Sequence, residues 1–583
     1  MDRAIELTVI AVYLGFLLLV GTAFRKLNLT VSDYFRNGCR GTWWLVGGSI
    51  FMSGISAVSF TGNAGVVFEA GWSILVVYIT NVVAGVIAAV WLGPWFRQLR
   101  AITAPEVIRL RFGPITQQVY AYVGLIMSIP GAGITLWALA IFTSTIFGID
   151  INLVIVTLGV VVIVYSMTGG SWAVMATDFI QGLLMVAMTI LVTVLCLREI
   201  GGIAGLTDLI SARHLAEDFR VIKPSGAFPE ERYTWSWAIG ISAIQLMHFI
   251  GLTSAPRFFS VKDGREARRA AIFATLLMAL GTTFWFIPPI VARLLYETQT
   301  LAVDLAKPAD AAYAVASMHV LPRGLGGMMA AAMFAATMSS MDTALNRTAA
   351  VLVNDIAPPL ARVCRRPLPS DKGLVQLSRA FTLILGLAVI GAALYFAGVG
   401  GKGMFELMFT ISGLVGLPLV IPMVYGVFFR RVPGWAALCS LAFSLVPALV
   451  SLVGPRLGVM APWTVQQNAL WILPVGTVGF FLPALFWGRT AADERTRIAG
   501  FFVRMRTPVD FAKEVGESND AKQLQLVGGF SLVLGIFVSA LVLVPNPVGG
   551  RLCIAAVAGV MLAVGATLLW AARRQQARVR QAT

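Results

Sequence analysis

Long apolar segments separated by short polar connections recur from one end of the chain to the other. A helix needs about 20 mostly apolar residues to cross a bilayer, and segments of this length dominate the sequence. The pattern predicts an all-α polytopic membrane protein with about 15 transmembrane helices. Their expected limits are 5–24, 43–68, 72–95, 117–147, 151–167, 176–197, 235–255, 270–296, 323–350, 376–397, 404–428, 434–453, 467–487, 525–544 and 552–572.

Composition and charge agree with a membrane protein. Of the 583 residues, 58% are hydrophobic and 12% are charged, which excludes an ordinary soluble protein. The net charge of +16 resides in short loops between spans, so we expect a lipid bilayer as the partner and no nucleic acid. Asp2 and Glu6 precede the first apolar run without a small-residue cleavage motif, which favours a retained span over a signal peptide. The five cysteines form no CxxC pair and indicate neither a disulfide framework nor a zinc site.

Basic residues concentrate in every second loop. The basic loops contain Arg25, Lys26, Arg36 and Arg40; Arg97, Arg100, Arg109 and Arg111; Arg257, Lys262, Arg265, Arg268 and Arg269; Arg362, Arg365, Arg366, Lys372 and Arg379; Arg430 and Arg431; Arg489, Arg495, Arg497, Arg504 and Arg506; and Arg573, Arg574, Arg578 and Arg580. The short connections between them are nearly free of lysine and arginine. By the positive-inside rule, a multi-pass protein of the inner or plasma membrane is expected, with its N-terminus outside and its C-terminus in the cytoplasm.

Two spans are interrupted by residues that disfavour a continuous helix. Residues 53–65 (SGISAVSFTGNAG) interrupt the second span, and residues 244–259 (IQLMHFIGLTSAPRFF) interrupt the seventh. Unwound backbone is tolerated inside a membrane only where it lines a protein cavity, and matching broken helices in two inverted repeats mark the substrate site of many secondary transporters. Because the two breaks lie five spans apart, the pattern favours a transport core over a pair of ordinary glycine kinks.

Residues 331–346 (AAMFAATMSSMDTALN) place hydroxyls and a carboxylate inside a span. One helical face carries Ala336, Ser339, Ser340 and Thr343. Asp342 lies beside this face, and an aspartate near the bilayer centre costs about 2.5–3.5 kcal/mol on insertion scales, so a partner for its charge is expected. A small hard cation suits these oxygen atoms. The alternatives are a helix interface built on small residues and a pairing of Asp342 with Arg347.

Three motifs carry a resemblance to a known family. They are GGSWAVMATDFIQG at 169–182, AAMFAATMSSMDTALN at 331–346 followed by Asn354 and Asp355, and TAPEVIRLRFG at 103–113. On these motifs the chain resembles the sodium:solute symporter family over roughly residues 5–488, which implies a LeuT-like five-plus-five inverted repeat with one extra N-terminal helix and several C-terminal helices. The implied parts are an N-terminal helix and loop (1–42), a first repeat of spans 2–6 (43–198), an extracytoplasmic loop (199–234), a second repeat of spans 7–11 (235–432), spans 12–13 (433–488), a cytoplasmic loop (489–524) and two extra helices with a short tail (525–583).

The resemblance also implies a sodium site. In the family, sodium is held by two carbonyls of the broken first core helix and by one carbonyl and two hydroxyls of the eighth. The corresponding residues here are Met52, Ile55, Ala336, Ser339 and Ser340. Neutral oxygens suit a monovalent ion held near helix termini, so Na⁺ is the expected coupling ion.

A second cation site is implied by the same resemblance. Asp178 matches the family's aspartate on the cytoplasmic exit path, although a helix cap is the alternative role for a carboxylate at this end of a span. Some sialic-acid-type members have a second site, whose positions here are Asp178, Asp342 and Thr343. Asp342 puts a carboxylate where those members have a hydroxyl. Two carboxylates near one site would hold a cation more tightly, or share a proton when the site is empty.

The expected substrate cavity is aromatic and neutral-polar. Its candidate residues are Ser59, Thr61, Asn63, Tyr78, Asn81, Gln245, His248, Phe409 and Thr410. The hexose-binding pattern of the family's sugar transporters is absent, and residues 119–147 contain no arginine for a sialate carboxylate. The set favours a small neutral polyol, modified sugar or related metabolite, with an organic acid or amino acid as the alternative solute. A purely structural role is the alternative for His248.

Together these patterns predict a sodium-coupled symporter that imports its solute by alternating access as a monomer, with the proton as the alternative coupling ion. An ion channel is disfavoured because the broken helices repeat within one chain, whereas channel filters tend to form by symmetric assembly. No enzymatic activity is expected, since neither H-E-x-x-H nor G-x-S-x-G occurs. The tail after Arg573 is too short for the signalling domain of a sensor.

Overall fold

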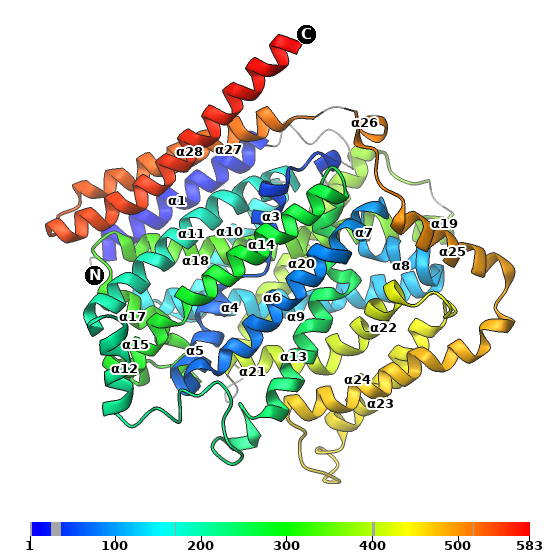
Figure 1. The fold of residues 1–583 in the computed structure, drawn as a ribbon, viewed down its shortest axis with the longest axis horizontal. Helices are drawn as coiled ribbons and strands as arrows, with labels where there is room; N and C mark the ends of the chain where they lie inside the picture. Colours follow the sequence, from blue (N-terminus) through cyan, green and yellow to red (C-terminus); the bar gives the residue numbers. More distant parts are fainter. Residues whose placement is uncertain are drawn as a thin grey trace.

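Helices run side by side and obliquely across the whole molecule (Figure 1). The computed structural model describes residues 3–24, 37–168, 171–365, 367–398, 403–516 and 518–582. Besides helices, these residues contain an isolated β-bridge between Gly41 and Val261. The all-α fold class expected from the sequence is therefore confirmed.

The first half of the chain contains the N-terminal helix, a broken second span and several long helices. Its elements are α1 (Arg3–Phe24), η2 (Asn37–Cys39), α3 (Trp43–Ser53), α4 (Ala57–Phe60), α5 (Gly62–Ala70), η3 (Gly71–Ile74), α6 (Leu75–Ile87), η4 (Ala88–Leu92), α7 (Gly93–Gln98), α8 (Ala104–Phe112), α9 (Pro114–Phe147), α10 (Ile151–Thr168), α11 (Ser171–Ile200), α12 (Gly202–Ala212), η5 (Pro229–Glu231), α13 (Trp235–Ile250), η6 (Leu252–Ser260), α14 (Gly264–Trp285) and α15 (Ile287–Leu295).

The second half continues with the serine-rich helix and ends in a helical hairpin. Its elements are α16 (Glu297–Leu301), η7 (Pro308–Ala311), α17 (Ala312–Val320), α18 (Leu325–Val351), η8 (Leu352–Ile356), α19 (Ala357–Val363), α20 (Asp371–Gly398), α21 (Met404–Ile411), η9 (Ser412–Gly416), α22 (Leu417–Phe428), α23 (Ala436–Val453), α24 (Val465–Phe481), η10 (Leu482–Arg489), α25 (Ala492–Arg506), α26 (Phe511–Glu514), α27 (Asp520–Ala540), η11 (Leu541–Leu543) and α28 (Val548–Ala582).

Every span expected from the sequence coincides with a helix or with successive helices. Eleven helical stretches of the described residues are long and apolar enough to cross a membrane, and Ala57–Gln98 alone covers the third expected span and part of the second. α1 and α10 contain shorter apolar helices, Ala4–Leu17 and Ile151–Met167. α18 belongs to neither set, because its glycines, serines and Asp342 lower its mean hydropathy.

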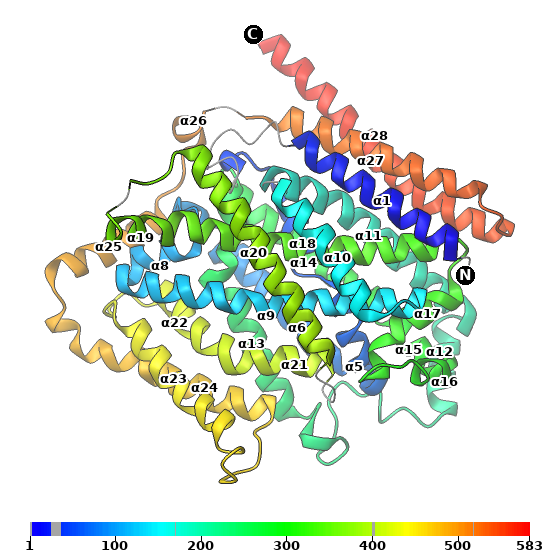
Figure 2. The ribbon, with the colours of Figure 1, turned by 180° about the vertical axis from the view of Figure 1, so that it is seen from behind.

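Segments from distant parts of the sequence gather at one end of the molecule, called here the basic end. α8, α19, α25 and α26 lie together there, whereas α12, α15 and α17 lie at the opposite end (Figure 1, and seen from behind in Figure 2). α25 packs against α7 and α8. Arg100 donates to both carboxylate oxygens of Glu514 at 2.7 and 2.8 Å, and these hydrogen bonds hold the pKa of the Glu514 carboxyl below its usual value. Basic segments from the α7–α8 region and from α25 thus meet in space.

Buried polar contacts close the opposite end. Lys223, between α12 and α13, donates through Nζ to Ala70 O at 2.9 Å and to two carbonyls of its own loop. Burial lowers the pKa of Lys223 to about 8. Asp310 of η7 accepts from Met404 N at 3.2 Å and lies against Gly65 of α5. These contacts fasten the loops of this end over α5 and the start of α21.

Both predicted interruptions of membrane helices are present. Gly54 caps α3, and α4 begins after Ser56, whose hydroxyl accepts from Val58 N. In the seventh span, Gly251 is extended (φ −72°, ψ 161°) and separates α13 from the 3₁₀ helix η6. Lipid cannot satisfy the polar groups that an unwound backbone exposes, so each break must face other parts of the protein.

The N-terminal helix is fastened to α18 by a buried carboxylate. Glu6 of α1 is fully buried and accepts from Gly324 N at 2.7 Å and from Gly327 N. These groups lie at the start of α18, where N–H groups lack intrahelical acceptors and the helix dipole favours negative charge. Gly327 permits the approach, because a Cβ there would collide with the Glu6 backbone.

Two C-terminal helices, α27 and α28, form a hairpin beside α1 (Figure 1). They meet through small residues, since a Cβ on Gly528, Gly535 or Gly565 would press against the facing helix. Phe530 of α27 packs edge-on against Phe16 of α1, with ring centroids 6.1 Å apart. The hairpin therefore extends the helical bundle on the side of α1.

Polar contacts also connect this hairpin to the start of α3. The Gln523 side chain accepts from Thr42 Oγ1 at 3.1 Å and donates to Arg40 O at 2.9 Å. Lys262, which precedes α14, forms an ion pair with Asp520 at 2.5 Å. The hairpin is thus bound to the two segments that lead into α3 and α14.

We expect Glu6→Ala to destabilise the protein, because it leaves two buried N–H groups of α18 without an acceptor. Such a loss costs about 1–3 kcal/mol. Thermal unfolding of the purified protein in detergent should show a lower midpoint than the wild type. Thr8→Ala, at an exposed position of the same helix, is the matched control. Equal midpoints for the two variants would contradict this role of Glu6.

Candidate functional site

The broken end of α3 meets the serine-rich part of α18. Ser340 Oγ donates to Ile55 O at 2.9 Å and lies 3.3 Å from Ala336 O. Ala57 N, at the start of α4, donates to Thr337 Oγ1 at 3.1 Å. Three of the five expected sodium ligands, Ile55, Ala336 and Ser340, are therefore connected through one hydroxyl.

The two remaining expected ligands lie beside this contact. Met52 O, in the last turn of α3, accepts from Ile55 N at 3.3 Å. Ser339 is buried on α18, and its hydroxyl lies beside the Asp178 carboxylate. Carbonyl and hydroxyl oxygens at a helix break are a donor set that suits a monovalent cation. The structure brings the five residues together between α3, α11 and α18.

Asp178 belongs to a buried cluster of charged and hydroxyl groups next to this contact. It is fully buried on α11 and accepts from Ser49 Oγ of α3. Arg257 of η6 approaches it, with 3.4 Å between Nη2 and Oδ2. The same Nη2 donates to Ser53 Oγ at 3.0 Å and to Thr343 Oγ1. The broken seventh span thereby adds a guanidinium to the residues expected to form a second cation site.

Asp342 is the second buried carboxylate of this region. Its Oδ1 accepts from Asn346 Nδ2 at 3.0 Å, one turn further along α18. Its Oδ2 side faces Ser166 of α10. The structure thus pairs Asp342 with Asn346 rather than with Arg347.

Arg257, Ser49 and Ser53 are absent from the set of site residues expected from the sequence. Arg257 was assigned to a basic loop, but it lies beyond Gly251 within the interrupted seventh span. The sequence feature that could have identified Arg257 as a site residue is its position inside a span that also contains a break. Ser49 and Ser53 lie one turn apart on α3, a helical spacing that the sequence already contained.

A cavity of about 300 Å³ adjoins the charge cluster. Its wall includes Gly54 at the break of α3, Asn81 of α6 and His248 of α13. Arg257 and Arg347 line the same cavity. Two of the expected substrate residues, Asn81 and His248, are thus placed next to both broken helices.

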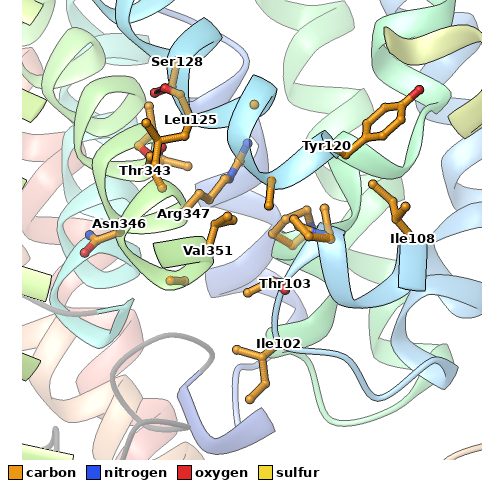
Figure 3. A pocket seen from close by; sticks show the side chains of 18 of the residues that line it. Ile102, Thr103, Ile108, Tyr120, Leu125, Ser128, Thr343, Asn346, Arg347 and Val351 are labelled. Carbon is orange, nitrogen blue, oxygen red and sulfur yellow. Dashed lines mark hydrogen bonds between the residues drawn. The ribbon is translucent and has the colours of Figure 1, made fainter. Parts of the chain in front are cut away.

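A second cavity, of about 320 Å³, leads from the same two arginines toward the basic end. It lies between α9, α18 and the connection from α7 to α8 (Figure 3). Arg347 reaches from α18 into this space, and Thr103 and Tyr120 line it from other elements (Figure 3). By contrast, a cavity near Trp237 and Phe409 on the opposite side has about 20 Å³. The larger spaces therefore lie on the basic side of the broken helices.

Four expected substrate residues hydrogen-bond in pairs. Asn63 Nδ2 donates to Tyr78 OH at 2.9 Å, and Gln245 Nε2 donates to Asn81 Oδ1 at 2.8 Å. Tyr78 also packs edge-on against Phe286, with ring centroids 4.8 Å apart. The pairs connect the second, third and seventh spans through neutral polar groups.

Three other expected substrate residues are engaged within their own helices or buried. Ser59 and Thr61 are buried, and Thr61 Oγ1 donates to Ala57 O at 2.9 Å. His248 Nδ1 forms a hydrogen bond with Ile244 O at 2.8 Å, which leaves the rest of the ring at the cavity wall.

Phe409 and Thr410 of α21 lie apart from the 300 Å³ cavity. Phe409 is buried against Phe405, with ring centroids 4.6 Å apart, and lines the small cavity on the opposite side. Thr410 is half-buried. The nine expected substrate residues are therefore not gathered around one cavity in this conformation.

Two of the sequence motifs meet in a structural joint at the basic end. Thr103 caps α8 by accepting from Glu106 N at 3.2 Å, and its hydroxyl donates to Asp355 Oδ2 at 2.6 Å. Gln117 of α9 donates to Asp355 Oδ1 at 2.6 Å. Asp355 lies in the π-helical turn η8, so its carboxylate ties α8 and α9 to the end of α18.

The fold and the contact between a broken helix and α18 define a secondary transporter. The family model described as Sodium:solute symporter family matches residues 6–443, and the protein belongs to this family. Members of the family are membrane transporters, and sodium is the coupling ion of the class. α27 and α28 lie beyond the matched range.

Relatives of this chain are named for two different solutes, sialic acid and myo-inositol. The chain is 23% identical over 482 residues to the sodium/sialic acid symporter SiaT of Proteus mirabilis (strain HI4320), covering 81% of this chain and 94% of the relative. It is 28% identical over 479 residues to the sodium/myo-inositol cotransporter 2 of Homo sapiens, covering 77% and 70%.

A solved structure supports the fold assignment. It is described as the substrate-bound outward-open state of a Na⁺-coupled sialic acid symporter with a novel Na⁺-site. The similarity has a TM-score of 0.70 at 21% identity and covers 84% of this chain and 98% of that chain. This likeness confirms the LeuT-like fold expected from the sequence.

Proposed function

We propose that this protein is a sodium-coupled symporter that imports a small, neutral, polyhydroxylated solute. The observation that carries the proposal is the 2.9 Å hydrogen bond from Ser340 Oγ to Ile55 O, which joins the unwound end of α3 to α18. Met52, Ala336 and Ser339 complete a set of neutral oxygens for one Na⁺. No carboxylate is needed in this set, because the ion carries a single charge and lies near helix termini.

Sodium and solute share one structural element in this proposal. Gly54, at the break that carries the sodium ligands, also lines the 300 Å³ cavity with Asn81 and His248. An ion that stabilises one geometry of the break therefore changes the affinity of the cavity for its solute, and the solute changes the affinity for the ion by the same factor. Each inward Na⁺ gains about 2.3 kcal/mol per 100 mV of membrane potential, which drives uptake.

The polar groups near the cavity support a neutral solute. Asn81, Gln245 and His248 offer amide and imidazole groups, and one set of relatives is named for myo-inositol. An organic acid is the second candidate solute. Arg347 favours it, because this guanidinium lines both cavities and its Nε has no hydrogen-bond partner among the described residues.

We also propose the arrangement of the chain in the membrane. The two inverted repeats comprise 43–198 and 235–432, the N-terminus lies outside, and the basic end with the C-terminus faces the cytoplasm. The large cavities then open toward the cytoplasm, and Lys223 and Asp310 help to close the outer side. The described conformation is accordingly the inward-facing one of a monomeric transporter.

Uptake by proteoliposomes tests the function. With an inside-negative potential, vesicles should accumulate radiolabelled myo-inositol when external Na⁺ is present and not when choline replaces it. A parallel arm uses N-acetylneuraminic acid, and Na⁺-dependent accumulation of this acid alone would assign the second candidate solute. Uptake that responds to a proton gradient and is equal in Na⁺ and choline would contradict sodium coupling.

Ser340→Ala should raise the Na⁺ concentration for half-maximal uptake by about tenfold or more, a loss of about 1.4 kcal/mol or more in binding. The reason is that the variant removes a ligand hydroxyl while alanine still suits a tight helix interface. Thr348→Ala is the matched control on α18, since its hydroxyl donates to Ala344 O within the helix. Unchanged Na⁺ dependence of Ser340→Ala would exclude this hydroxyl as a ligand.

Cys364 is a natural probe of orientation, because it is exposed at the end of α19 whereas Cys39 and Cys196 are buried. We expect a membrane-impermeant maleimide to label the protein in inverted membrane vesicles and not in right-side-out vesicles. The Cys364→Ser variant identifies the labelled thiol by losing the signal. Labelling of Cys364 from the outside would reverse the proposed orientation.

A further inference from the structure

Arg257 lies among the residues that the family resemblance assigns to a second cation site. Its side chain is buried, with 8% of the residue exposed. Nη2 contacts oxygens from three different helices: Ser53 Oγ of α3 at 3.0 Å, Asp178 Oδ2 of α11 at 3.4 Å, and Thr343 Oγ1 of α18. One nitrogen atom thus lies at the centre of an oxygen cluster.

These oxygens include two of the three expected ligands of a second cation, Asp178 and Thr343. A sodium ion placed among them would lie against a guanidinium, and two positive charges at such a distance repel strongly in a protein interior that screens charge weakly. Each hydrogen bond to Arg257 also occupies an oxygen lone pair that a cation would otherwise use. The residues present therefore do not fit a second sodium ion in this arrangement.

The cluster contains two acidic and two basic side chains. Asp178 and Asp342 are buried carboxylates, and Arg257 and Arg347 are guanidinium groups of the same region. By the family resemblance, Asp342 corresponds to a position where the sialic-acid-type members have a hydroxyl, so this chain has an additional acidic side chain in the region. This extra carboxylate offsets the positive charge that Arg257 brings into the protein interior.

We infer that the guanidinium of Arg257 is a built-in cation that takes the place of a second sodium ion, so that the transporter couples one Na⁺ per cycle. This inference rests on the proposed function as a sodium symporter. The guanidinium is covalently attached to η6, so it neutralises Asp178 and connects α3, α11 and α18 without being carried across the membrane. It adds no electrical driving force.

The segment that carries Arg257 is itself fixed at the basic end. Phe258 packs against Phe96 of α7, with ring centroids 6.3 Å apart. Arg97 Nε donates to Val261 O at 2.5 Å. The proposed sodium site at the break of α3 contains no such cationic group. Ser340 Oγ donates there to Ile55 O, and no cationic side chain of the described residues hydrogen-bonds to either group.

Equilibrium binding of ²²Na⁺ to the purified protein tests the inference, with choline keeping the ionic strength constant. The wild type should bind one Na⁺ per chain without cooperativity. Arg257→Gln removes the positive charge and leaves two carboxylates, so this variant should bind two Na⁺ per chain, with a Hill coefficient rising from about 1 toward about 2. The double variant Arg257→Gln/Asp342→Ser, which has the hydroxyl of the sialic-acid-type members, should also bind two and serves if the single variant does not fold.

Two control variants separate the charge of Arg257 from a general effect on the region. Arg257→Lys keeps a positive charge and should still bind one Na⁺. Arg347 lines the same cavities but forms no hydrogen bond with Asp178 or Thr343 among the described contacts. The Arg347→Gln variant should therefore also bind one Na⁺. Two Na⁺ in the wild type, or one in a folded Arg257→Gln variant, would overturn the inference and leave sodium symport intact. Absence of any Na⁺ binding by the wild type would instead refute the proposed function.

Discussion

The rest of the site depends on one constraint, which is that an unwound backbone at membrane depth must find its hydrogen-bond partners inside the protein. At the break of α3, Ile55 O accepts from Ser340 and Ala57 N donates to Thr337. Both partners lie on α18, whose many alanines and glycines allow close approach. Ser340 Oγ, which replaces a lost helical hydrogen bond at the break, is also one of the proposed sodium ligands, so tolerance of the break and the proposed ion binding have the same physical origin.

Buried charged side chains must likewise find their partners inside the protein. Asp178 is held by Ser49 and by Arg257, and the guanidinium reaches it only because η6 turns back into the molecule after Gly251. Removing one partner from a buried ion pair typically costs about 3–5 kcal/mol, because the other charge remains without compensation. The second broken span is therefore as important to the charge cluster as the first is to the proposed sodium ligands.

Spans and breaks could be predicted from the sequence, because hydropathy and helix-breaking residues are local properties of the chain. The contact between Ile55 and Ser340 could be expected only through the family resemblance. The role of Arg257 could not be predicted, since the positive-inside rule assigns an arginine near a span end to a loop, and only the fold brings Ser53 and Thr343 to it. Substrate residues were harder still, because helix rotation and local packing decide which side chains reach a cavity, as Phe409 against Phe405 illustrates.

The hydrogen bonds of Gln523 have a mechanical consequence. They attach the hairpin of α27 and α28 to the residues that precede α3, the helix that carries the first break. A displacement of this end of α3 must therefore carry the hairpin along or break these bonds. The hairpin exposes large apolar side chains, including Ile536, Leu552 and Val560, so its displacement moves the lipid around it. The rate at which α3 moves during the conformational cycle then depends on the viscosity and thickness of the bilayer.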